Sequence, residues 1–486
     1  MRVRFEILLF TILSLLPFWG ISGVIESNSK GIKIAYTYPA EETPIQYVVI
    51  GDVSYEGNKI TKPHIIKREL LFNSGDTISV SEFEKILSSS RENLLNTSLF
   101  NFVEFTANLH PNNGSTINIF FVERWYLWPF PTVDIHERNI NTWMDSPNFD
   151  RVSYGFYLVF ENFRGRKERL RFNLRAGYNQ RYAFSYTIPY LNTNQTLGMS
   201  VSAGYVRAKE INFMSIDNKQ VFYKDPLSFV RTDIYAQLNF TYRKNFYHTH
   251  FINFRYNNLA FADTVLLLNP LFLNSDNSHL QYFMLKYEYI SDYRDLKAYP
   301  LKGYFNKLSV TQHGFNIFHN DISPLFSVEN SFRRYLALGD KWYFAAGLNT
   351  KVSFAENYPY FLERGLGYNE NFVRGYEYYV VDAQHFGVLK TNLKYNILPQ
   401  RVKRLSFIPG EKFGLMHYAI YINAFVDAGY TYDRVFFERN PYSNIWLGGA
   451  GLGVDFVTYY DKVFRTEFTI NRHGKPGLFF HIVAPI

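Results

Sequence analysis

The 486-residue sequence contains no cysteine. Disulfide frameworks, thiol catalysis and thiolate metal sites are therefore excluded. Charge is also scarce, because Asp, Glu, Lys and Arg make up 19% of the chain, against about a quarter in a typical soluble domain. The mean hydropathy of −0.20 is too low for a bundle of membrane helices, each of which needs about 20 consecutive apolar residues. Helical membrane proteins are therefore excluded as well.

Aromatic residues, in contrast, are abundant, with 39 Tyr and 47 Phe giving most of an aromatic content of 19%. This content is far above what a soluble core needs, and it also excludes intrinsic disorder. Abundant aromatics, modest hydropathy and short apolar segments together are typical of a β-barrel that spans a membrane. The formal charge of +8 is scattered and forms no basic stripe, so we expect no nucleic-acid partner.

Residues 1–23 have the layout of a secretory signal peptide, with Arg2 and Arg4 ahead of an apolar stretch and small residues at its end. A membrane anchor is the alternative, but Pro17 and the short apolar core disfavour it. We therefore expect the mature chain to work outside the cytoplasm, with 24–44 as a linker.

Residues 45–124 predict a small α+β domain. The expected order is strand, helix, helix, strand, strand, and a hairpin signal at 111–114 joins the last two strands. The expected strands are 47–55, 100–109 and 116–122, with helices beginning near Thr61 and Ser79.

This stretch resembles a POTRA (polypeptide-transport-associated) domain over its whole length. The matching residues are Gly57-Asn58, Thr61, Ile65 to Leu70, Gly75-Asp76, Arg91, Leu94, Leu99-Phe100 and Val103. The resemblance implies a periplasmic module whose sheet edge accepts an extended client strand, since unpaired backbone groups at an edge can recruit another strand. A spacer that only packs under the membrane domain is the alternative.

Residues 125–486 predict an all-β membrane barrel of about sixteen antiparallel strands. Polar and apolar residues alternate, for example over 170–176, so one face can meet lipid while the other lines a polar interior. A soluble β-sandwich is the alternative. The expected strands are 131–139, 151–161, 169–178, 181–190, 196–207, 229–243, 247–258, 279–291, 303–313, 325–337, 342–354, 385–397, 417–429, 448–458, 462–472 and 476–484.

Two motifs lie in the second half of this region. The long loop 356–385 contains Val373, Arg374, Gly375 and Tyr376, and the strand 417–429 ends in Phe-Val-Asp-Ala-Gly, with Asp427 and Gly429. These residues match the V-R-G-[FY] loop motif and the F-x-D-x-G strand motif of the BamA/TamA family of outer-membrane assembly and transport barrels. Together with the POTRA-like domain, the resemblance to this family covers essentially the whole mature chain.

An arginine on a loop folded into a barrel needs a carboxylate partner, since an unpaired buried charge costs several kcal/mol. Asp427 can accept two hydrogen bonds from Arg374, and the resemblance implies that this contact locks the loop inside the lumen. An exposed extracellular loop is the alternative. Family members often carry a further acidic residue on the twelfth strand, where Asn392 stands here, so we expect Arg374 to rely more heavily on Asp427.

The resemblance also implies a weak seam between the first and last barrel strands. On the first strand the seam residues are Pro131, Val133 and Ile135, and on the last they are Phe480 and Ile482. Proline cannot donate to a strand ladder, so it fits an edge that pairs poorly. A client strand can add at such an edge and pass sideways into lipid. An ordinary closed junction is the alternative.

Enzyme motifs are absent from the sequence, including G-x-S-x-G, the P-loop and H-E-x-x-H. Gly449 to Gly453 resemble a cofactor loop, but a strand follows them, and small residues on a barrel strand explain them better. His248 and His250 share a strand face without a third ligand. We therefore predict no enzyme activity, no cofactor and no metal.

These features predict an outer-membrane protein of a Gram-negative cell, with its POTRA-like domain in the periplasm. The predicted function is the assembly, insertion or translocation of unfolded outer-membrane or secreted clients within the lipid bilayer. Accessory lipoproteins are left open as further partners. The alternatives are a two-partner-type secretion pore, a passive porin and, more distantly, an outer-membrane phospholipase.

Overall fold

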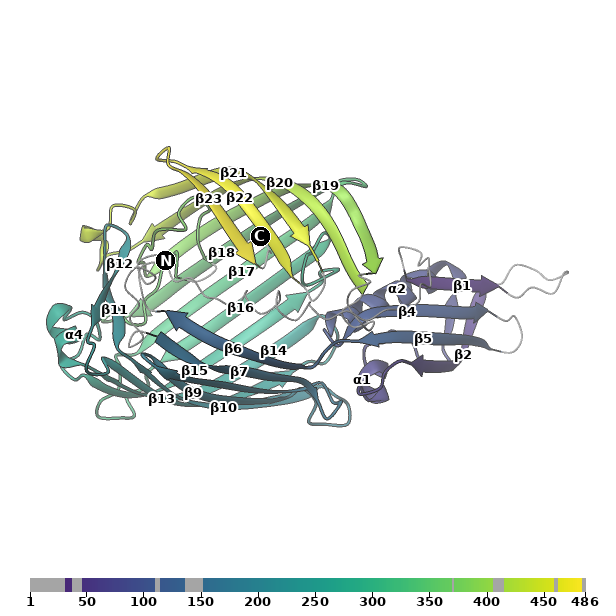
Figure 1. Cartoon of the computed structure of the whole chain (residues 1–486), viewed down its shortest axis with the longest axis horizontal. Coiled ribbons are helices and arrows are strands. Elements are labelled where there is room, and N and C mark those ends of the chain that lie inside the picture. The colour runs from purple at the N-terminus through teal and green to yellow at the C-terminus, as the bar shows by residue number, and fades with distance from the viewer. Residues whose placement is uncertain are drawn as a thin grey trace, which may run out of the picture.

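The computed structural model describes residues 31–36, 46–109, 114–135, 152–368, 371–404, 415–458 and 462–482. They form a small α+β domain at one end of a large barrel (Figure 1). The predicted signal peptide lies outside the described residues, and of the predicted linker only 31–36 is described. No helix in the described part of the chain is both long enough and apolar enough to cross a bilayer.

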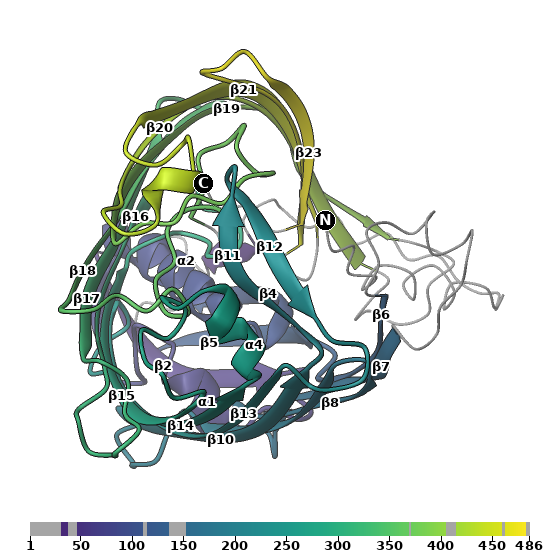
Figure 2. The ribbon, with the colours of Figure 1, turned by 90° about the vertical axis from the view of Figure 1, so that its left-hand side faces the viewer.

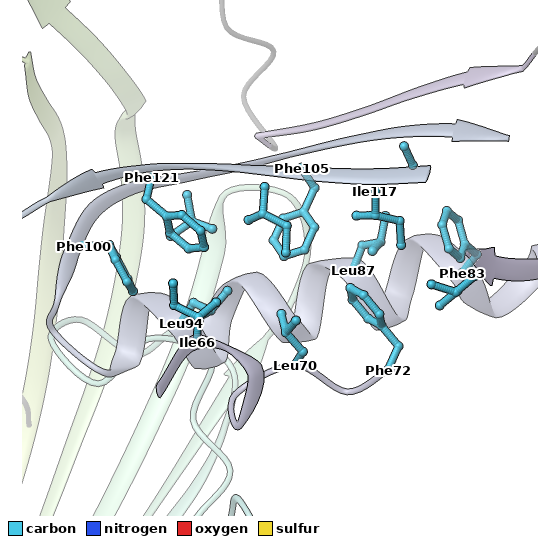
Figure 3. Close-up of a cluster of buried hydrophobic side chains, with 14 of the residues drawn as sticks. Ile66, Leu70, Phe72, Phe83, Leu87, Leu94, Phe100, Phe105, Ile117 and Phe121 are labelled. Atoms are coloured by element: carbon cyan, nitrogen blue, oxygen red, sulfur yellow. The ribbon is translucent and has the colours of Figure 1, made fainter. Parts of the chain in front are cut away.

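The α+β domain has the predicted order of elements, with two short strands added. A five-stranded sheet runs in the order β1-β4-β5-β2-β3, and both helices cover one of its faces. Between them lies an apolar core that includes Phe72, Phe83, Leu94 and Phe105 (Figure 3). The elements are β1 (Ile32–Tyr36), β2 (Tyr47–Glu56), α1 (Pro63–Lys67), β3 (Thr77–Ser79), α2 (Val80–Asn96), β4 (Phe100–Leu109) and β5 (Ser115–Glu123).

Strand β1 was not expected from the sequence. It pairs in parallel with β4, from Ile32 opposite Phe105 to Tyr36 opposite Leu109. On the other side of the sheet, β3 pairs only with Tyr47–Val49 of β2. One edge of this domain is therefore already taken by a segment of the same chain.

The barrel wall contains all sixteen predicted strands, in sequence order around the sheet. Its first strand begins four residues earlier than expected, and β19 and β20 are longer than expected. The strands are β6 (Leu127–Ile135), β7 (Val152–Phe163), β8 (Glu168–Gly177), β9 (Gln180–Ile188), β10 (Leu197–Ala208), β13 (Arg231–Tyr242), β14 (His248–Phe261), β15 (His279–Asp292), β16 (Gly303–His313), β17 (Leu325–Ala337), β18 (Trp342–Ala355), β19 (His385–Arg404), β20 (Leu415–Tyr432), β21 (Trp446–Val457), β22 (Val463–Asn471) and β23 (Pro476–Ile482).

Side chains alternate between the two faces of the wall, as β22 shows most clearly. Phe464, Phe468 and Ile470 are exposed on the outer surface, whereas Arg465 and Glu467 are buried inside. Successive side chains of a strand point to opposite faces, so an apolar belt and a charged lumen arise from one sequence pattern. This alternation is that of a membrane barrel and not of a soluble sandwich.

The sheet has two ends, and these are β6 and β23. No backbone pairing joins them among the described residues, and their ribbons are separated when the barrel is viewed along its axis (Figure 2). We call this interval, bounded by β6 and β23, the seam.

Three short elements absent from the prediction lie at the barrel end away from the α+β domain (Figures 1 and 2). They are the hairpin β11 (Glu210–Ile216) and β12 (Lys219–Lys224), the helix α4 (Asp263–Leu268) and the turn η2 (Phe437–Arg439). The hairpin and α4 pack on a second apolar core that includes Phe261, Phe272 and Tyr360.

The α+β domain is docked on the turns of the first half of the barrel. The backbone N–H of Lys62 donates to the carbonyl oxygen of Gly165 at 2.9 Å. Gly165 has a φ of +71°, and a Cβ there would lie 2.1 Å from the carbonyl oxygen of Ile60. The approach of the two backbones therefore requires glycine.

A buried carboxylate completes this interface. Glu69 is 1% exposed and accepts a hydrogen bond from Arg243 at 3.1 Å, while Lys167 lies 3.7 Å away. Burial alone would raise the pKa of Glu69, but the positive charges of Lys167, Arg243 and Arg68 outweigh it and hold the pKa at about 2. We call these four residues the docking cluster.

Candidate functional site

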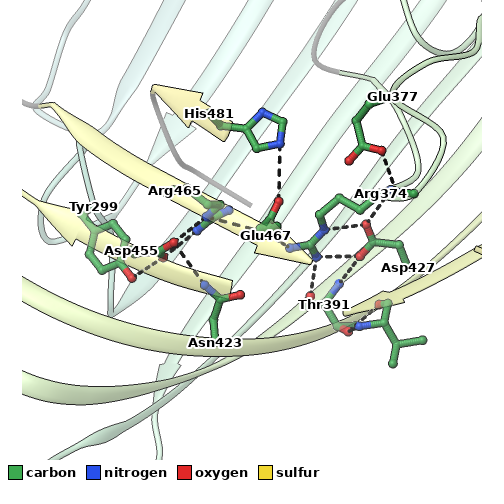
Figure 4. Close-up of polar contacts among 12 residues, drawn as sticks. Tyr299, Arg374, Glu377, Thr391, Asn423, Asp427, Asp455, Arg465, Glu467 and His481 are labelled. Carbon is green, nitrogen blue, oxygen red and sulfur yellow. Dashed lines mark hydrogen bonds and ion pairs between the residues drawn. The ribbon is translucent and has the colours of Figure 1, made fainter. Parts of the chain in front are cut away.

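The loop between β18 and β19 enters the barrel and places Arg374 against the inner wall (Figure 4). The guanidinium forms a bidentate contact with Asp427 of β20, with Nε to Oδ2 at 2.8 Å and Nη2 to Oδ1 at 2.7 Å. Arg374 is 3% exposed and Asp427 1%. The structure thus brings the two predicted partners together in the lumen, and an exposed extracellular position for Arg374 is excluded.

A second carboxylate also holds this arginine. Nη1 of Arg374 donates to Glu467 of β22 at 3.0 Å, and Nη2 donates to the carbonyl oxygen of Thr391 at 2.7 Å. The expectation that Arg374 depends mainly on Asp427 is therefore corrected. Glu467 provides the second carboxylate that family members often carry at the position of Asn392. We call Val373 to Tyr376 with Asp427 and Glu467 the loop lock.

Glycines make room for the loop on the wall. A Cβ at Gly449 would lie 1.8 Å from the carbonyl oxygen of Arg374, and one at Gly429 would lie 2.5 Å from Cγ2 of Val373. Gly375 has a φ of +93°, and its carbonyl oxygen accepts a hydrogen bond from Asn471 at 3.0 Å. The loop backbone therefore lies directly on β20 and β21, at positions where side chains would prevent contact.

Aromatic rings fix the two sides of the lock. The guanidinium of Arg374 lies 3.6 Å from the ring centre of Phe425, the aromatic residue of the strand motif. The ring of Tyr376 is 2% exposed and packs edge-on against Tyr442, with 5.4 Å between ring centres. Both rings restrict the loop to one position.

A second buried ion pair extends the network toward the α+β domain. Arg465 of β22 donates to Asp455 of β21 at 2.7 and 2.8 Å, and the hydroxyl of Tyr299 donates to Asp455 at 2.7 Å. Arg465 also lies 3.8 Å from Glu467, so the two pairs form one chain of charges (Figure 4). The sequence analysis missed these residues. Their signal was the alternation of charged and aromatic residues along β22.

The predicted seam residues lie on the two terminal strands of the sheet. Val133 and Phe480 are 50% and 72% exposed and face outward, and Pro131 is also exposed. Ile135 and Ile482 end β6 and β23, and their side chains lie outside the described residues. The structure places the five residues on the strands that border the seam.

The two histidines considered for metal binding contact tyrosines on the outer wall. His248 hydrogen-bonds to the hydroxyl of Tyr289 at 2.7 Å, and His250 to that of Tyr287 at 2.8 Å. No group of three or more His, Asp or Glu side chains arranged to hold a metal occurs in the described part of the chain.

Comparison with family models identifies both parts of the chain. Residues 162–382 match the Omp85 superfamily domain, and residues 48–124 match the surface antigen variable number repeat, a POTRA model. No curated protein matches the sequence.

Three solved structures of low identity are similar to this chain. CdiB from Escherichia coli has a TM-score of 0.50 at 11% identity, over 90% of this chain and 75% of that one. BamA from Haemophilus ducreyi lacking POTRA domains 1–3 has a TM-score of 0.49 at 15% identity, over 88% and 81%. CdiB from Acinetobacter baumannii has a TM-score of 0.44 at 14% identity, over 90% and 73%.

The fold and these matches define an outer-membrane-type β-barrel preceded by a POTRA domain. The chain belongs to the Omp85 superfamily. Members of this family are transporters or assembly factors that handle client proteins at the outer membrane, and they are not enzymes. The family places the barrel in the outer membrane and the POTRA domain in the periplasm.

Proposed function

We propose that this protein inserts or assembles client β-strands at the outer membrane through the seam between β6 and β23. The observation that carries the proposal is the pair of sheet edges without a backbone partner among the described residues. Unpaired N–H and C=O groups inside hydrocarbon are costly, so an edge at that depth favours the arrival of another strand. Burial of the client's apolar face in lipid drives its release without chemical fuel.

The terminal strands are suited to transient pairing. Strand β6 contains Pro129 and Pro131, neither of which can donate a backbone hydrogen bond. Strand β23 has seven residues, against twelve in β21. A client strand therefore competes with few backbone hydrogen bonds for either edge.

The loop lock stiffens the wall on the β23 side of this seam. It ties the loop to β20 through Asp427 and to β22 through Glu467, the strand next to β23. We propose that it keeps β20 to β22 in register while β23 exchanges partners. In the POTRA domain the β4 edge is already paired with β1, so a client strand on that side would have to add to the five-residue strand β1.

Site-specific photocrosslinking in cells tests the proposal. Benzoylphenylalanine in place of Phe480 should crosslink to unfolded outer-membrane barrels. The same replacement of Phe254, which is 49% exposed on the far wall, should crosslink only to lipid. Equal protein adducts at both positions would contradict a client site at the seam.

A two-partner-type secretion pore is the second candidate, because its fold is also represented among the similar structures. It predicts one dedicated client that crosslinks to the lumen and not at Phe480. Arg333 of β17 is a suitable lumen position, because its neighbour Phe332 is 42% exposed on the outer face and successive side chains alternate. Depletion followed by proteomics of the outer membrane separates the two functions, since loss of many barrels supports assembly and loss of one secreted protein supports export. Solute conductance without any client effect would instead indicate a passive porin.

A further inference from the structure

A cavity of about 510 Å³ lies inside the barrel, at the end away from the POTRA domain. The inner faces of β6 to β10 and β13 form one side of it, and the β11–β12 hairpin forms another. Phe361 and Arg364 of the loop between β18 and β19 complete the lining. The loop lock is not part of this cavity.

The lining is strongly basic. Five arginines contribute to it, namely Arg175, Arg181, Arg207, Arg231 and Arg364, against two acids, Asp134 and Glu210. Both acids already have cationic partners, since Asp134 lies 2.5 Å from Arg175 and Glu210 lies 3.4 Å from Lys224. Arg231 is bound by Asp233 of its own strand. The positive charge that remains belongs to Arg181, Arg207 and Arg364, which have no carboxylate within 4 Å among the described residues.

Two of the five lining arginines, Arg175 and Arg181, are directed into the lumen by the alternation of the wall strands. On the outer face, Leu174 and Tyr182 are 47% and 42% exposed, so their neighbours Arg175 and Arg181 point inward. Arg364 reaches the same cavity from the loop, and its guanidinium is flanked by Tyr360 and Tyr368 at 4.9 and 4.7 Å from the ring centres. The flanking rings hold this charge in place before any ligand arrives.

Buried donors in the cavity lack partners. Nη1 of Arg364 and Nδ2 of Asn212 have no hydrogen bond within the described structure, although both atoms are shielded from solvent. Asn212 is 7% exposed and lies in the lining. An unmet buried donor is costly, so the protein itself leaves hydrogen-bonding capacity unused beside the cavity.

We propose that this cavity binds a phosphate-bearing anion. Guanidinium groups match phosphate oxygens in pairs, and a tetrahedral phosphate can meet arginines that arrive from different strands. The cavity is much larger than a phosphate ion requires, and its lining includes Ile211, Phe222 and Phe361 beside the charges. It also includes Thr132, Val133 and Asp134 of β6, the strand that borders the seam. A lipid headgroup can therefore enter from the membrane past the β6 edge.

Calorimetric titration of the full-length protein in neutral detergent tests this site. The probes are dihexanoyl phosphatidic acid, inorganic phosphate and a hexaglutamate peptide. The phosphatidic acid should bind with one site per chain, and Arg181→Gln with Arg364→Gln should weaken it at least about tenfold. Arg333→Gln removes a lumen arginine outside the cavity and should leave affinity within about twofold, in the range of an independent site. Heat-modifiable migration verifies that each variant is folded, and the single variant Arg364→Gln provides a second measurement.

The probes separate the sources of the anion. Tighter binding of phosphatidic acid than of inorganic phosphate assigns the site to a lipid headgroup, and equal affinity assigns it to free phosphate. Absence of binding by either probe would overturn the proposal. It would also be overturned by equal losses in the cavity and control variants, or by tighter binding of hexaglutamate, which would indicate an acidic client segment.

Discussion

The two halves of the barrel wall are held by different means. The first half, β7 to β14, is supported from outside the lumen by the POTRA domain, through the docking cluster. The last strands, β20 to β22, are supported from inside by the loop lock. Arg243 and Lys167 of the docking cluster keep 22% and 23% of their side chains exposed, whereas Arg374 keeps 3%. If a carboxylate partner is removed, water can therefore solvate the cations of the docking cluster, but it cannot reach Arg374 in the loop lock.

This difference bears on the proposed entry of client strands at the seam. The docking cluster involves no residue of β19 to β23, and the loop lock involves no residue of β6 to β14, although Phe102 of the POTRA domain also lies against His417 of β20. Separation of the two borders therefore breaks neither the docking cluster nor the loop lock. The lock should matter more for stability, and the docking cluster more for the position of the POTRA domain.

Removal of the lock arginine should give the largest effect. Arg374→Glu removes the bidentate partner of buried Asp427, leaves Glu467 with Arg465 at 3.8 Å as its nearest guanidinium, and adds a third carboxylate, so we expect a loss of about 3–5 kcal/mol in the free energy of unfolding. Urea unfolding of the barrel in vesicles measures this change. Arg333→Glu, in the lumen but outside the lock, is the control and should cost less.

The charge exchange of Arg374→Glu with Asp427→Lys sharpens the same test. Recovery should be small, because the introduced carboxylate still faces Glu467. A double-mutant cycle of the single alanine variants at 374 and 427 should nevertheless show coupling, and its absence would contradict the lock.

Loss of the docking carboxylate should have an intermediate effect. Glu69→Gln leaves three cations, of which Arg243 and Lys167 retain partial access to water, so we expect a loss of about 2 kcal/mol at the interface. Because the chain has no cysteine, Lys85→Cys and Lys244→Cys provide two unique sites for spin labels. The distance distribution between them should broaden with Glu69→Gln and stay narrow with the exposed control Glu56→Gln. An unchanged distribution in both variants would show that the cluster does not position the domain.

One added methyl group where the loop contacts β21 should lower the free energy of unfolding. Gly449→Ala places a Cβ against the carbonyl oxygen of Arg374, and overpacking of this kind costs about 1–3 kcal/mol. Its neighbour Gly448 is the matched control, because a Cβ there would be 3.8 Å from the nearest atom, Cβ of Arg472. Equal unfolding free energies for the two alanine variants would show that the loop does not lie on β21.

Of these changes, a lower pH should have the smallest effect, a partial loss of the stabilisation that Glu69 gives to the docking cluster. The pKa of Glu69 is held at about 2, below its ordinary value of 4.5, so its contribution is complete above pH 4.5 and is lost as the pH falls toward 2. At pH 4 we expect a loss of less than about 1 kcal/mol. The spin-label distances should therefore be unchanged between pH 7 and 5 and should broaden below pH 4. Broadening that begins near pH 6 would indicate another titrating group.

Local patterns explain what was predicted correctly. Alternation and turn residues lie within each strand, so all sixteen wall strands were found, and the motif residues led to Arg374 and Asp427. The first strand was placed four residues late because Pro129 was expected to precede the strand. A terminal strand tolerates proline, since one of its edges needs no ladder.

Elements that depend on distant partners were missed. Strand β1 has five residues and pairs with β4, about seventy positions further along the chain, so no local pattern indicates it. Hairpin β11–β12 is stable only against the second apolar core. Glu467 became a partner of Arg374 through the register of β20, β21 and β22, which sequence alone does not give.

The unequal heights of the wall have a consequence for the surrounding bilayer. Strands β19 and β20 contain 20 and 18 residues, whereas a strand tilted by about 45° needs only about 9–11 residues to cross the hydrocarbon. Pairing of β20 with β21 begins at Ala419, so Leu415 to Tyr418 extend past their neighbour toward the POTRA domain. If the hydrocarbon layer matches the length of the short strands β22 and β23, the periplasmic end of the β19–β20 hairpin extends beyond it into water. We therefore expect the bilayer to be thinner beside β22 and β23, which would lower the barrier for a polar loop to cross at that place.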